Sequence, residues 1–105
     1  MPQTRVKHSG TSDTHIVLAG TDAEHLVEAK RMLGNAENWL KTAANAESCH
    51  AVHNPLDRAI RCLHFAYANL INAKNHTPDW MATQYIRLNK WAESIHDKFD
   101  RECVR

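Results

Sequence analysis

The chain has 105 residues, of which 43% are hydrophobic and 24% charged, and these are ordinary values for one globular domain. Three glycines and three prolines are too few for a turn-rich β fold and favour long helices. The formal net charge of +1 gives no long-range attraction for phosphate backbones, and no apolar stretch approaches membrane-spanning length.

The first twenty residues predict a polar N-terminal arm that is partly disordered. Its one continuous apolar run, Ile16-Val17-Leu18, is too short for the core of a signal peptide. The segment could still dock as an extended strand across the rest of the chain. We expect a single helical domain to follow the arm, over residues 21–105.

Start signals divide this domain into three amphipathic helices. Thr21 and Glu24 form a capping box, Asn54-Pro55 has the form of an N-cap followed by proline, and Thr77-Pro78 repeats that signal. The predicted helices cover about residues 21–45, 55–75 and 78–102.

Leucine and alanine alternate along the first two helices at heptad spacing. The seams are Leu26, Ala29, Leu33, Ala36, Leu40 and Ala43, then Leu56, Ala59, Leu63, Ala66, Leu70 and Ala73. When residues whose numbers sum to 99 are paired, every layer matches one large side chain with one small one, which fills space without voids. This pattern predicts an antiparallel hairpin of two closely approaching helices.

Apolar side chains also flank the hairpin seam on both sides. One flank has His25, Met32 and Trp39 beside Cys62 and Phe65, and the other has Ile60, His64, Tyr67 and Ile71. The third helix has one apolar stripe, Met81, Tyr85, Leu88, Ala92, Ile95 and Phe99, so it can cover only one flank. We expect a second copy of the chain, or the arm, to cover the other.

Dimerisation would therefore complete the core as a helical bundle, and homo-oligomers of this kind are common. Aromatic side chains are enriched among interface anchors. The candidate interface residues are Trp39, Trp80, Trp91, Tyr67 and Ile71.

Three dispersed cysteines, Cys49, Cys62 and Cys103, indicate reduced thiols in a cytoplasmic protein. Cys49, His50 and His53 are the candidates for metal ligation, but they supply at most three of the four ligands that zinc prefers. The interpretation we favour for this segment is an exposed loop without a metal, and we expect no cofactor.

The second helix carries the segment Asp57-Arg58-Ala59-Ile60-Arg61-Cys62-Leu63-His64-Phe65-Ala66-Tyr67. Together with the helix before it, over roughly residues 22–75, this segment resembles the HEPN superfamily of small all-α proteins. The resemblance implies a metal-independent RNase whose cleft lies between two protomers, or an inactive relative that binds or dimerises. By position, Arg58 would stabilise the phosphate and His64 would transfer the proton.

Three functions follow from these patterns. The preferred one is a non-enzymatic interaction module that self-associates and presents a helical surface to a protein partner. The alternative is a HEPN-like RNase or its inactive relative, the only interpretation that brings in nucleic acid. The third is a histidine-rich module that responds to metal or pH.

Overall fold

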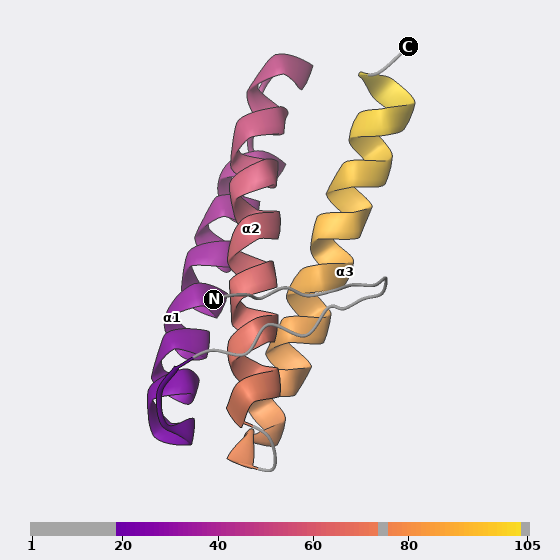
Figure 1. Cartoon of the computed structure of the whole chain (residues 1–105). Helices are drawn as coiled ribbons and strands as arrows, with labels where there is room; N and C mark the ends of the chain where they lie inside the picture. The colour runs from indigo at the N-terminus through magenta and orange to yellow at the C-terminus, as the bar shows by residue number, and fades with distance from the viewer. Residues whose placement is uncertain (1–18, 74–75, 104–105) are drawn as a thin grey trace, which may run out of the picture.

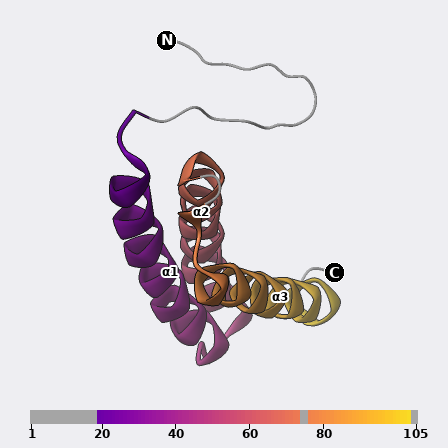
Figure 2. The same ribbon diagram turned by 90° about the horizontal axis from the view of Figure 1, so that it is seen from below.

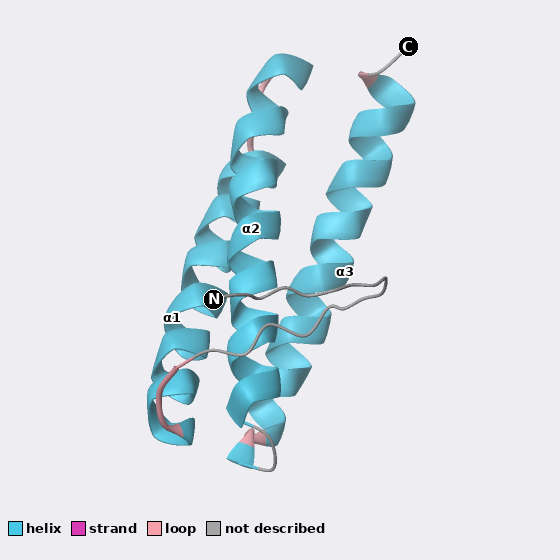
Figure 3. Ribbon diagram, in the orientation of Figure 1, coloured by secondary structure: helices cyan, strands magenta, loops and turns pink. Residues whose placement is uncertain are grey.

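The computed structural model describes residues 19–73 and 76–103, and this part of the chain contains helices and no strand (Figure 3). The helices are α1 (Asp22–Ala44), α2 (Cys49–Ala73) and α3 (Asp79–Glu102). The chain runs up through α1, down through α2 and up again through α3 (Figure 1). The all-α prediction is confirmed. None of the described helices is long and apolar enough to cross a membrane.

The predicted capping box begins α1. The Thr21 hydroxyl accepts a hydrogen bond from the backbone N–H of Glu24, and the Glu24 carboxylate accepts one from the backbone N–H of Thr21. The second bond lowers the pKa of Glu24. Gly20 precedes the cap with φ of 130°, a conformation that residues with a Cβ rarely adopt. Residues 1–18 of the predicted N-terminal arm lie outside the described part of the chain.

The leucine and alanine seams of α1 and α2 form one hydrophobic core, as the alternation predicts. Leu33 and Leu40 are among the largest fully buried side chains, and Ala29, Ala36, Ala59 and Ala66 have no exposed surface. These residues join one continuous cluster, and Leu26 and Leu70 pack against it. Because alanine leaves room for the facing leucine, the two helix axes can lie close together.

The third helix lies to one side of the α1–α2 pair (Figure 2). Three contacts join it to α2: the ring of Tyr67 stacks on that of Tyr85, His53 stacks on Phe99, and Cys49 is bonded to Cys103. The residue numbers of each pair sum to 152, which is what two antiparallel helices in one constant register require. The α3 stripe is buried or half-buried along its whole length, as predicted.

The start of α2 differs from the prediction. The helix begins at Cys49, six residues before the predicted start at Pro55, and it contains Pro55. Ser48 provides the cap, since its hydroxyl accepts a hydrogen bond from the backbone N–H of Ala51. A proline inside a helix costs about 3 kcal/mol. The added turns bring Val52, His53 and Cys49 into contact with the core or with α3, and these contacts offset that cost.

The prediction of three reduced thiols is wrong for two of them. Cys49 and Cys103 form a disulfide with a Cα–Cα distance of 5.4 Å, and Cys62 is the free cysteine. Sequence spacing gave no sign of this pair, because the two residues are 54 positions apart and meet only through the α2–α3 register. The disulfide removes the argument from cysteine usage for a cytoplasmic location, which stays a prediction.

Exchanging one layer of the hairpin tests its register. Leu63→Ala should cost about 2–5 kcal/mol because it leaves a cavity. Ala36→Leu should cost about 1–3 kcal/mol because it overfills the same layer. The double variant should recover most of both losses, measured by urea unfolding. Simple addition of the two losses would show that Ala36 and Leu63 do not face each other.

Breaking the disulfide should lower the stability of the fold. It closes a loop of 54 residues, and the loss of that restraint from the unfolded chain amounts to about 4 kcal/mol in the chain-entropy model. We expect Cys103→Ser to unfold at a lower temperature than the oxidised wild type, measured by circular dichroism with a chelator present. Cys62→Ser is the matched control and should keep its sensitivity to reductant. Equal melting of oxidised wild type and Cys103→Ser would contradict the prediction.

Candidate functional site

One flank of the hairpin is left uncovered by the described part of the chain. We call it the hairpin face, and it consists of His25, Met32 and Trp39 of α1 with Arg58, Cys62, Phe65 and Asn69 of α2. Two contacts across the hairpin hold it together, one between His25 and Asn69 and one between Trp39 and Arg58. The contacts that α3 makes with α2 lie on the opposite flank, at Tyr67, His53 and Cys49, and α3 also contacts α1, where Gln84 and Arg87 donate to the carboxylate of Glu37.

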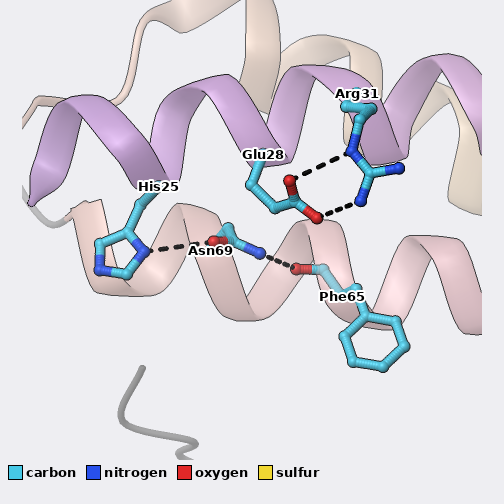
Figure 4. Close-up of polar contacts among 5 residues, drawn as sticks. All are labelled: His25, Glu28, Arg31, Phe65 and Asn69. Carbon is cyan, nitrogen blue, oxygen red and sulfur yellow. Dashed lines mark hydrogen bonds and ion pairs between the residues drawn. The ribbon is translucent and has the colours of Figure 1, made fainter. Parts of the chain in front are cut away.

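A buried polar pair lies at one end of the hairpin face (Figure 4). His25 and Asn69 are each 5% exposed, and 3.2 Å separates His25 Nδ1 from Asn69 Oδ1. The Asn69 amide nitrogen donates to the backbone carbonyl of Phe65 at 2.9 Å, which identifies Oδ1 as the acceptor. Nδ1 of His25 therefore carries the proton, and the pair fixes the imidazole's orientation at the α1–α2 junction.

Charged residues form the rim of the face beside this pair. The carboxylate of Glu28 accepts two hydrogen bonds from the guanidinium of Arg31, as Figure 4 shows, and these bonds lower the pKa of Glu28. The Glu28–Arg31 ion pair is exposed to water, so it contributes little to stability.

Burial raises the pKa of the Cys62 thiol, and the charge of Arg31 acts in the opposite direction. At neutral pH Cys62 is therefore a protonated, weakly nucleophilic thiol.

The other end of the face combines an aromatic ring with a cation. The guanidinium of Arg58 lies over the indole of Trp39, 5.3 Å from the ring centroid. Trp39 is half-buried and Arg58 is exposed. Between the two ends lies Phe65, whose side chain is 57% exposed. An exposed phenylalanine on the same flank as a half-buried tryptophan is suited to contact with another protein surface.

The predicted interface residues do not share one surface. Trp91 packs against the chain's own core, and Tyr67 stacks on Tyr85, with 5.5 Å between ring centroids. Burial raises the pKa of that Tyr85 hydroxyl. Ile71 is half-buried, and Trp80 is 53% exposed at the start of α3. Of the five, Trp39 alone belongs to the hairpin face.

Arg58 and His64 lie on different sides of α2. Arg58 contacts Trp39 on the hairpin face. His64 is exposed and lies on the stripe of Ile60 and Tyr67, which is the flank that α3 occupies. Six residues of regular helix turn through about 600°, so the two side chains point about 120° apart. One chain does not bring this pair to a common cleft.

The candidate metal ligands are placed in the first turns of α2. Cys49 is bonded to Cys103, and His53 stacks on Phe99 with ring centroids 6.2 Å apart. Within the described residues, no group of three or more histidine, cysteine or carboxylate side chains is arranged to hold a metal ion. Asn69 was missed in the sequence, although the hairpin register places it near His25.

A scan against profiles of known protein families gives no match to this chain, and neither do searches of curated proteins and of solved structures. The function is therefore argued from the residues and the geometry of the chain itself.

Removing the polar partner of the buried histidine should destabilise the hairpin. Asn69→Ala leaves His25 Nδ1 without its acceptor at a buried position, which costs about 1–3 kcal/mol. Chemical denaturation at neutral pH measures the loss. Asn38→Ala, at an exposed position of α1, is the control and should stay within about 0.5 kcal/mol of wild type. Equal stabilities of the two variants would show that the bond has no net value.

Proposed function

We propose that this protein is a non-enzymatic interaction module that self-associates through the hairpin face. The observation that supports this most is the exposed phenylalanine on the α2 side of this face: Phe65 is 57% exposed, although its α2 neighbours Cys62 and Asn69 are half-buried and buried. The arrangement matches the usual anatomy of an interface, with an apolar centre and a charged rim. Trp39 and Met32 would add apolar area on either side.

A second copy of the chain suits this face for reasons of symmetry and charge. In a two-fold dimer the same patch meets itself, so the surface must be self-complementary. The rim carries both signs, with the carboxylate of Glu28 near one end and the guanidinium of Arg58 near the other. A two-fold axis that runs across the helices near Phe65 would place Glu28 of each protomer opposite Arg58 of its partner. It would also bring the two phenyl rings into contact.

The helical surface for a protein partner would then lie elsewhere on the molecule. Trp80 and Ile86 are each 53% exposed on α3, away from the hairpin face. Aromatic and aliphatic side chains of this kind can anchor a partner's helix. In this proposal, α1 and α2 serve self-association and the outer surface of α3 serves the partner.

The HEPN-like RNase remains a weaker alternative. It needs Arg58 and His64 at one cleft, and a dimer built on the hairpin face would place both Arg58 side chains at the interface and leave both His64 rings outside it. Incubating the protein with labelled single-stranded RNA in chelator tests it. Cleavage that disappears in both Arg58→Ala and His64→Ala would replace our proposal with the RNase.

Truncating the central phenylalanine should weaken self-association. We expect Phe65→Ala to raise the dimer dissociation constant by at least about tenfold, because truncating an anchor costs more than about 1.4 kcal/mol. Light scattering over a range of concentrations measures the mass. The matched control is Ile86→Ala, which removes a side chain of similar exposure from α3 and should leave the mass unchanged. A wild type that stays monomeric at every concentration would refute the proposal.

A further inference from the structure

The two cysteines of the disulfide meet in a hollow that also contains the two neighbouring histidines. An open pocket of about 570 Å³ lies between the first turns of α2 and the last turn of α3. Cys49, His50, His53, Asp57 and Cys103 line it, together with Asn54 and Phe99. Thiols, imidazoles and a carboxylate are the side chains that bind zinc in proteins. The fold therefore supplies, through Cys103, the ligand that the sequence segment around Cys49 lacks.

The backbone spacing of these residues suits a single tetrahedral ion. Cys49 and His53 are four residues apart on one helix, so their side chains lie on the same face. Cys103 stands opposite Cys49 on α3, with a Cα–Cα distance of 5.4 Å. Two thiolates bound to one zinc ion are about 3.8 Å apart, given Zn–S bonds of about 2.3 Å. Rotation of the cysteine side chains covers that change, and His50 lines the same hollow as the fourth ligand.

In the oxidised chain the two sulfurs are bonded to each other and cannot ligate a metal, and within the described residues no metal-binding group is formed. We propose that reduction of the Cys49–Cys103 disulfide creates a zinc site made of Cys49, Cys103, His53 and His50. A thiol reductant converts the disulfide to two thiols and is itself oxidised to a disulfide. Zinc then displaces one proton from each thiol and binds two thiolates and two neutral imidazoles.

This site goes beyond the proposed function, because the hairpin face lies on the other flank of α2. The bound metal would replace the disulfide as the crosslink that holds the end of α3 against the start of α2. Soft thiolate ligands with imidazole select zinc over magnesium or calcium, which prefer oxygen ligands. The chain would thus keep the same three-helix arrangement with either of two crosslinks, one oxidised and one reduced.

Cobalt reports the site directly, because tetrahedral cobalt bound to thiolate has intense visible bands and a charge-transfer band. The tag-free, full-length chain is reduced, freed of reductant and titrated with Co²⁺ under inert gas. We expect one equivalent to bind with these bands and one equivalent of Zn²⁺ to abolish them. His53→Gln should weaken binding by more than about tenfold, since even outer-shell partners of metal ligands contribute that much. His64→Gln, on the same helix outside the hollow, is the control.

A second measurement needs no variant. In the reduced wild type, zinc should protect Cys49 and Cys103 from alkylation and leave the rate at Cys62 unchanged, as read by mass spectrometry. Cys62 is an internal control because it lies on the hairpin face, beside Arg31. The proposal is overturned if cobalt gives no thiolate band, if the oxidised protein binds it equally well, or if zinc leaves the alkylation of Cys49 and Cys103 unchanged.

Discussion

The close packing of α1 against α2 is the constraint on which the rest of the structure depends. The alternation of leucine and alanine along both seams lets the two helices approach, and Leu33, Leu40 and Leu63 are buried almost completely. A hairpin built this way is narrow, because half of its seam consists of the smallest apolar side chain. The larger apolar residues must then lie on the flanks of the seam, and each flank needs its own cover.

Only one of the two flanks is covered by the described part of the chain, and this separates structure from proposed function. On one flank α3 supplies the cover, through the Tyr67–Tyr85 stack and the disulfide. On the other flank the chain retains a buried polar pair, His25 and Asn69, and an exposed Phe65. A polar pair in this position fixes the helix register, since a shift of either helix would leave two buried groups without partners.

Much of the fold could be predicted from the sequence because it follows from local periodicity. The capping box at Thr21 and the alternating seams are short-range patterns, and both are present in the structure. The predicted start of α2 was wrong, because Asn54-Pro55 is a good local start signal, whereas the earlier start at Cys49 is stabilised by contacts with the core and with α3. The disulfide was missed for the same reason, because it joins residues 54 positions apart through the α2–α3 register, which no local pattern gives. The His25–Asn69 pair was missed although the α1–α2 register predicted from the seams places the two residues near each other.

The disulfide also divides the chain into two mechanically different parts. Residues 49–103 form a closed covalent ring that contains all of α2 and α3, whereas α1 lies outside it. A force that pulls on Thr21 and Cys103 can therefore extend only α1 and the turn that follows it. The load passes directly through the disulfide, so the backbone between Cys49 and Cys103 carries none of it, and α1 would peel away from the hairpin seam as the single extensible segment.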